Sequence, residues 1–167
     1  MILDVKNLTH GFGDRGIFDD NLKGMGTTIV AALVKNKEAC IAHVGDSRAY
    51  IIHSDCIEQI TKDHSIVQQL IDSGTITEEQ AKYHPQRNLI TRAVGTEKYV
   101  LADGVSVDVS SGDYILICSD GLSSYVDESE ITDILANTKL NEVVSKLIEA
   151  ANNSGGKDNV TVVVIKA

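Results

Sequence analysis

Three carboxylates in short turns are the residues of this sequence with the most evident chemistry. Each turn also contains a Gly, a Ser or an Asn and borders an apolar, strand-like run, and the carboxylates are Asp46, Asp120 and Asp158. If those strands lie side by side, their ends bring the three acids together. Hard divalent cations take oxygen ligands, and Mg²⁺ typically keeps several waters beside one or two carboxylates. A site of this kind would activate water for phosphoryl hydrolysis.

The polar neighbours of these acids have two interpretations. Ser47 and Ser119 are candidates to hydrogen-bond the turns, and Asn159 is a candidate either to orient Asp158 or to cap its turn. A single aspartate in such a turn more often accepts a bond from a nearby backbone amide than binds a metal. The acids therefore indicate a metal site only as a set.

The composition argues against several classes of protein. The chain has 167 residues and a net charge of -9, which argues against non-specific nucleic-acid binding and fits either a cation site or solubility alone. No apolar run approaches the roughly 20 residues of a membrane span, and no secretory signal opens the chain. Cys40, Cys56 and Cys118 lack CxxC spacing, which argues against a zinc site and favours a reducing, cytoplasmic location. Cys40 and Cys118 lie in apolar runs and are expected in the core.

Apolar runs and turn residues predict a fold rich in strands. Four strands joined by short turns read as one antiparallel meander, and they span residues 27–34, 38–44, 48–53 and 56–60. Later strands are expected at residues 105–109, 114–118 and 160–165. Helices are predicted where capping residues precede apolar stripes, at 66–73, from 78, from 128 and over 143–151. This order favours an α+β fold with helices packed outside antiparallel sheets.

Six segments, in this order and spacing, give the chain a specific resemblance. They are GMGTTIVAAL (24–33), AHVGDSRAYII (42–52), QITKDHSIVQQLIDSGTITEEQA (59–81), HPQRNLITRAVG (84–95), GDYILICSDGLS (112–123) and GGKDNVTVVVI (155–165). Together they resemble the bacterial type 2C, metal-dependent protein serine/threonine phosphatases. The resemblance covers residues 22–167, which we expect to form one phosphatase-like domain after an atypical segment, residues 1–21.

The resemblance implies an α+β fold of two packed antiparallel β-sheets flanked by helices, a four-layer αββα sandwich that is incomplete at its N-terminus. It implies that Asp120 and Asp158 bind paired Mg²⁺ or Mn²⁺ ions and that Asp46 helps to bind a further ion shared with Asp120. Residues 63–95 would form a flap beside the site and influence substrate choice. His64 and His84 belong to this flap.

The activity implied by the resemblance is hydrolysis of phosphoserine and phosphothreonine in proteins by a metal-activated water. The expected partners are phosphorylated proteins, the substrates of a cognate serine/threonine kinase, and neither nucleic acid nor a membrane is expected. Among the other polar residues, His43 and His53 are expected to be sheet residues, and Arg87 and Arg92 to support the flap rather than to hold phosphate.

The sequence also departs from the family. An Asp-Gly-x-Gly-Gly-His motif and an arginine that holds phosphate have no counterpart in it, so no catalytic residue is assigned and fewer metal ions are expected. The alternative function is a catalytically inert binding module or truncated fragment. Residues 1–20 resemble the opening strands of an ABC-type ATPase domain, with Phe12 placed to stack on adenine, but the GxxxxGK[ST] loop is lacking. Missing strands would leave sheet edges open, which predicts a homo-oligomer.

Overall fold

Two antiparallel sheets form the centre of the protein. The computed structural model describes residues 11–12, 15–16, 25–54 and 56–167. One sheet has the order β3-β4-β7, with strands at Ile29–Lys35, Glu38–Val44 and Asp103–Asp108. The other has the order β6-β5-β8-β9, with strands at Cys56–Gln59, Arg48–His53, Tyr114–Cys118 and Val162–Lys166. A further short pair joins β1 (Gly11–Phe12) to β2 (Arg15–Gly16). The segment 1–21, with its resemblance to an ATPase domain, lies largely outside the described residues.

The predicted strands at 38–44, 48–53 and 114–118 are confirmed, but the predicted meander is wrong. β3 pairs with β4 and β5 pairs with β6, yet β4 continues to β7 whereas β5 continues to β8. The chain therefore leaves one sheet and enters the other between β4 and β5. Apolar runs between turn residues predict each strand, but a short polar turn has the same sequence signature whether it closes a hairpin or crosses between sheets.

Local turn chemistry explains the β3–β4 hairpin. Asn36 and Lys37 have φ values of 52° and 65°, and two successive residues with positive φ are the signature of a type I′ hairpin turn. β9 differs from its prediction, because Val163 is 47% exposed where a strand covered on both faces was expected. β9 pairs with β8 at the end of the sheet order, and a terminal strand is covered less than a central one.

Five helices are described, and their bounds are Ile66–Asp72 (α1), Glu78–Ala81 (α2), Asp120–Ser123 (α3), Glu128–Asn137 (α4) and Leu140–Asn153 (α5). The predicted caps of the first two are confirmed: Ser65 accepts a bond from the Gln68 amide, and Thr77 and Gln80 form a capping box. The cap predicted at Asp127 is wrong in detail, because this N-cap residue of α4 makes no side-chain bond to the helix. The short α3 was not predicted.

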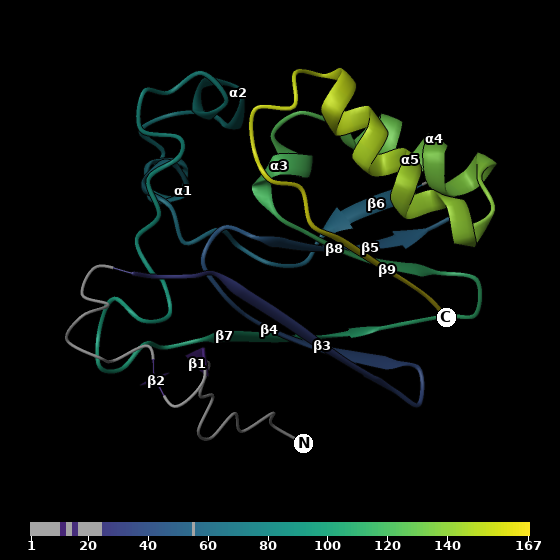
Figure 1. Ribbon diagram of the computed structural model, residues 1–167, viewed down its shortest axis with the longest axis horizontal. Coiled ribbons are helices and arrows are strands. Elements are labelled where there is room, and N and C mark those ends of the chain that lie inside the picture. The colour runs from purple at the N-terminus through teal and green to yellow at the C-terminus, as the bar shows by residue number, and fades with distance from the viewer. Residues whose placement is uncertain (1–10, 13–14, 17–24, 55) are drawn as a thin grey trace.

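The layers place helices over one sheet and that sheet over the other. Figure 1 shows α3, α4 and α5 above the four-stranded sheet, with the three-stranded sheet beneath it and α1 and α2 to one side. The first core lies between helices and sheet and includes Leu116, Ile131 and Leu147. The second includes Ala39 and Ile115 and joins the two sheets. The predicted α+β class and its two packed antiparallel sheets flanked by helices are thus confirmed.

The expected burial of two cysteines is confirmed for one of them only. Cys118 is buried as expected, whereas Cys40 is only half-buried, with its Sγ 3.3 Å from Ser106 Oγ on the neighbouring strand. No helix of the described residues has the length and hydropathy that a membrane crossing requires.

Candidate metal centre

The register of the four-stranded sheet brings the three acidic turns to one end. Arg48 lies opposite Cys118, and Cys118 lies opposite Val162. The turn before Arg48 carries Asp46, the turn after Cys118 carries Asp120, and the segment before Val162 carries Asp158. Because the strands are antiparallel, the end of one strand meets the start of its neighbour at a common edge.

The Asp46 turn packs closely against the start of the three-stranded sheet. Gly45 has a φ of +110°, and a Cβ added to it would lie 2.3 Å from Thr28 Cγ2. The Thr28 hydroxyl also lies 2.8 Å from the hydroxyl of Ser47, in a hydrogen bond between the two side chains. Both the conformation and the space around residue 45 therefore require glycine, and Thr28 contacts the turn on either side of Asp46.

The Asp120 and Asp158 turns lie in direct contact. A Cβ on Gly121 would lie 2.3 Å from the carbonyl oxygen of Asn159, so glycine lets the two backbones approach. Ser119 Oγ donates to that same oxygen at 3.1 Å and accepts from the Thr161 amide at 3.0 Å. Asp158 Oδ1 accepts from the Asn159 amide at 2.7 Å. These bonds fix the spacing between the two acids.

Repulsion among the acids marks the site electrostatically. Burial, and then the negative charge of Asp120, raises the pKa of Asp46. Burial, and then the charge of Asp158, raises the pKa of Asp120. Asp120 therefore interacts with both of the other acids. Burial and neighbouring negative charge both disfavour the ionised form of a carboxyl group, and a bound divalent cation would offset that cost.

The residues fit a hydrated divalent ion rather than an ion enclosed by protein ligands. Within the described ranges, no group of three or more His, Cys, Asp and Glu side chains converges closely enough to hold one ion. Mg²⁺ is commonly bound through one or two carboxylates and retains several waters. Asp46 with Asp120, and Asp120 with Asp158, are the pairs of carboxylates that would supply such oxygen ligands. The metal-binding role of these residues stays a prediction.

An arginine–aspartate pair supports the same end of the sheet. Arg48 donates to both carboxylate oxygens of Asp63, at 3.0 Å from Nε and 2.8 Å from Nη2, and to the Tyr50 hydroxyl at 3.3 Å. Burial and this pairing leave Arg48 committed to Asp63 rather than free to hold a phosphate. The nearby Cys118 is also unreactive, because burial raises the pKa of its thiol to about 12.

Four of the remaining polar residues, His43, His53, His84 and Arg92, agree with their predicted structural roles, and the role of Arg87 stays a prediction. His43 and His53 lie in β4 and β5. His84 Nδ1 accepts a bond from the Gln86 amide at 3.2 Å, within the segment 63–95. Arg92 donates to Asp103 at 2.7 Å and to the Leu101 carbonyl at 3.2 Å.

Sequence reasoning did not single out His64, which accepts a bond from the Gly45 amide next to Asp46. Its partner is 19 residues away, and no local pattern indicates the contact.

Comparison with known proteins agrees with this geometry. The profile of the family Protein phosphatase 2C matches residues 15–70. The chain is 42% identical to "Serine/threonine phosphatase stp" of Listeria innocua serovar 6a over 147 aligned residues. The alignment covers 87% of this chain and 58% of that protein. The PPM Ser-Thr phosphatase MsPP from Mycobacterium smegmatis, in complex with cacodylate, is 38% identical with a TM-score of 0.81, over 90% of this chain and 68% of that one.

The chain belongs to the protein phosphatase 2C family. A further structure, the catalytic domain of serine threonine protein phosphatase PstP in complex with 2 manganese ions, is 42% identical with a TM-score of 0.77, over 86% of this chain and 60% of that one. The chain therefore spans about three-fifths of the length of its curated relatives, for example 58% of the Listeria innocua phosphatase.

Proposed function

We propose that this chain hydrolyses phosphoserine and phosphothreonine esters in proteins, with Mg²⁺ or Mn²⁺ bound by Asp46, Asp120 and Asp158. The observation that carries the proposal is the register that puts Arg48, Cys118 and Val162 side by side, because it gathers the three acidic turns at one edge. Family membership supports the reaction class, and the manganese complex of PstP supports the kind of ion.

Some residues of the site would bind the metal ions, and others would hold the metal-binding turns in place. Asp120 would contribute to both ion positions, since its charge interacts with Asp46 and with Asp158. The bonds of Ser119 to Asn159 and Thr161 hold these turns at a fixed spacing. When bound, divalent ions supply Lewis acidity, which acidifies water and offsets charge on phosphoryl oxygens. Residues 63–95 would form the flap of a domain spanning residues 22–167.

The test is manganese-dependent hydrolysis of p-nitrophenyl phosphate and of a phosphothreonine peptide. We expect the activity of Asp120→Asn to be at least about 100-fold lower than that of the unaltered chain, because the substitution removes one negative charge from both ion positions. Asp127→Asn is the matched control: Asp127 is exposed and its side chain makes no bond to α4, so activity should stay at the level of the unaltered chain. Equal activity of all three proteins contradicts the proposal.

The alternative function is an inert phosphatase-like binding module. The observation that favours it is that, among the described residues, no three His, Cys, Asp or Glu side chains converge closely enough to hold one ion. Binding of Mn²⁺, measured by calorimetry and lost in Asp120→Asn, without turnover of either substrate would identify such a module. Binding of ATP without any phosphatase activity would instead support the nucleotide-binding fragment.

We further propose that the substrates of the chain are proteins phosphorylated by a serine/threonine kinase.

We also propose that the chain self-associates through the edge of a β-sheet. Among the described strands, β3 and β9 stand at the ends of their sheet orders. Leu33 on β3 is 41% exposed and Val163 on β9 is 47% exposed, and apolar edges favour pairing with another chain. Light scattering at increasing protein concentration should show a dimer or larger assembly, and a monomer throughout contradicts this part. The cytoplasmic location also stays a prediction.

A further inference from the structure

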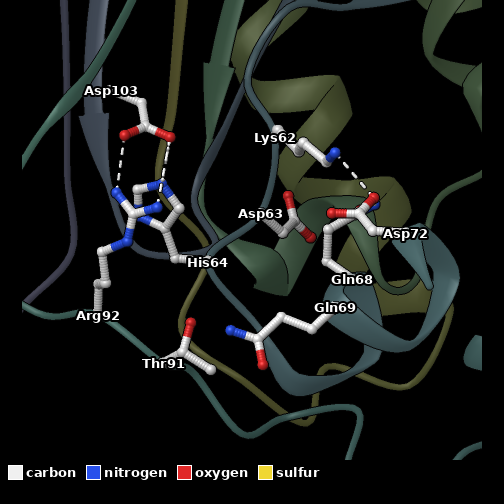
Figure 2. A pocket seen from close by; sticks show the side chains of 9 residues that line it. All are labelled: Lys62, Asp63, His64, Gln68, Gln69, Asp72, Thr91, Arg92 and Asp103. Atoms are coloured by element: carbon white, nitrogen blue, oxygen red, sulfur yellow. Dashed lines mark hydrogen bonds and ion pairs between the residues drawn. The ribbon is translucent and has the colours of Figure 1, made fainter.

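His64 is a buried histidine that connects three parts of the protein. It is 5% exposed and follows β6 at the start of the segment 63–95. Its hydrogen bonds reach the turn between β4 and β5, strand β7 and the later part of that segment. His64 lines a polar cavity of about 100 Å³. Figure 2 shows Asp103 and Arg92 close to one another beside the His64 ring.

Two hydrogen bonds join His64 to Gly45 in the turn between β4 and β5. The backbone amide of His64 donates to the Gly45 carbonyl at 2.9 Å, and the Gly45 amide donates to His64 Nδ1 at 3.0 Å. Since Nδ1 accepts a hydrogen bond, the proton of the neutral ring resides on Nε2. The two bonds hold Gly45 on both sides of its Cα, directly before Asp46.

The other ring nitrogen connects to the flap. His64 Nε2 lies 3.1 Å from Asp103 Oδ2, and Arg92 Nη1 donates to Asp103 Oδ1 at 2.7 Å. The dashed lines in Figure 2 trace both contacts of this carboxylate. The Thr91 amide also donates to the His64 carbonyl at 2.7 Å. A continuous set of hydrogen bonds therefore runs from residues 91 and 92, through Asp103 and His64, to Gly45.

A second histidine fixes the plane of the ring. His43 stacks on His64 with 4.6 Å between ring centroids and 21° between planes. His43 Nε2 lies 2.8 Å from the Lys62 carbonyl, so this ring is itself held by a hydrogen bond. Both imidazoles are buried, so His64 has one orientation available, with Nδ1 toward Gly45 and Nε2 toward Asp103.

We propose that His64 is a positioning residue for the Asp46 carboxylate, acting through the backbone of Gly45. The inference rests on the proposed function, because it concerns the same site. A residue that orients a metal ligand typically changes metal affinity or activity 10- to 100-fold when it is lost. His64 acts through the backbone of Gly45, so its loss would leave Asp46 present but less well held.

Two conservative substitutions separate the two nitrogens of the ring. In His64→Asn the amide group reaches the place of Nδ1 and can still accept from Gly45, whereas in His64→Gln it reaches the place of Nε2 and can still contact Asp103. We measure the Mn²⁺ concentration for half-maximal binding by calorimetry and the exchange rate of the Gly45 amide by NMR. We expect His64→Asn to remain within about threefold of the unaltered chain and His64→Gln to need about 10-fold more Mn²⁺.

The outcomes distinguish this inference from the proposed function. Faster Gly45 exchange and weaker Mn²⁺ binding in His64→Gln alone support positioning. Equal effects of both substitutions, or no effect of His64→Gln in a folded protein, overturn it while the function stands. If the unaltered chain binds no Mn²⁺, the proposed function fails and the positioning role fails with it. His64→Leu, which removes both contacts, should resemble His64→Gln in metal binding if it folds.

Discussion

Replacing Gly45 with alanine tests whether the turn that carries Asp46 is held by close packing. The residue has a φ of +110°, and the added Cβ would lie 2.3 Å from Thr28 Cγ2 and 2.6 Å from Thr28 Cβ. An L-residue in the left-handed region costs about 1–2 kcal/mol, and overpacking costs about 1–3 kcal/mol more. We expect Gly45→Ala to lower the free energy of unfolding by about 2–5 kcal/mol.

Gly112→Ala is the matched control. Gly112 has a similar φ of +99°, but no atom lies within 4 Å of its added Cβ. Only the conformational cost of about 1–2 kcal/mol should remain there. The difference between the two variants therefore isolates the contact with Thr28, at about 1–3 kcal/mol, or about 3–9 °C in Tm for a domain of this size.

The assay is urea unfolding followed by circular dichroism, with a double-mutant cycle that adds Thr28→Gly. This second change removes both Thr28 atoms that lie under 3.0 Å from the new Cβ, so the cost of Gly45→Ala should fall when both are present. Should Gly45→Ala prove no more destabilising than Gly112→Ala, or additive with Thr28→Gly, the argument that Thr28 packs against the Asp46 turn is refuted.

Three other predictions concern the same end of the molecule and its stability. Gly121→Ala should destabilise more than Gly112→Ala and weaken Mn²⁺ binding, because the added Cβ would lie 2.3 Å from a backbone oxygen of Asn159; thermal unfolding with and without Mn²⁺ measures both effects. Saturating Mn²⁺, at about 100 times its Kd, should stabilise the chain by about 2.7 kcal/mol, and an unchanged Tm, or an equal rise in Asp120→Asn, contradicts the metal centre. Burial raises the pKa of Asp113, but hydrogen bonds from a backbone amide and from His53 outweigh it and leave that pKa lowered. Asp113→Ala should therefore lower the free energy of unfolding by about 1–3 kcal/mol at pH 7, and this difference should shrink as the pH falls below about 4. Urea unfolding of both proteins at pH 7 and at a pH below about 4 measures the change. An equal cost under the two conditions excludes the ionised carboxylate as the cause.

Local patterns predicted the elements because their causes are local. The β3–β4 hairpin follows from two residues that adopt positive φ, Asn36 and Lys37. The start of α2 follows from the capping box of Thr77 and Gln80, which are three positions apart. Apolar runs bounded by turn residues predicted the bounds of β4, β5 and β8. Each of these depends on residues within a few positions of one another, so a sequence pattern contains the needed information.

The split of the predicted meander shows where that information ends. The chain from β4 to β5 passes into another sheet because Gly45 fits against Thr28 and because β4 and β5 find different partners, β7 and β8. Those partners are about 60 residues away in the sequence, and the choice among possible pairings depends on burial summed over the whole fold. No short pattern encodes it.

The sequence by itself singled out the acids that we predict to bind a cation: Asp46, Asp120 and Asp158 stand out by their turns and by the family resemblance. Only the tertiary structure decided that Asp120 interacts with both other acids and that His64 holds the backbone beside Asp46. The physical reason is that residue type fixes the chemistry of a side chain, whereas distances between groups far apart in the chain follow from strand register and from the close approach of backbones at Gly45 and Gly121.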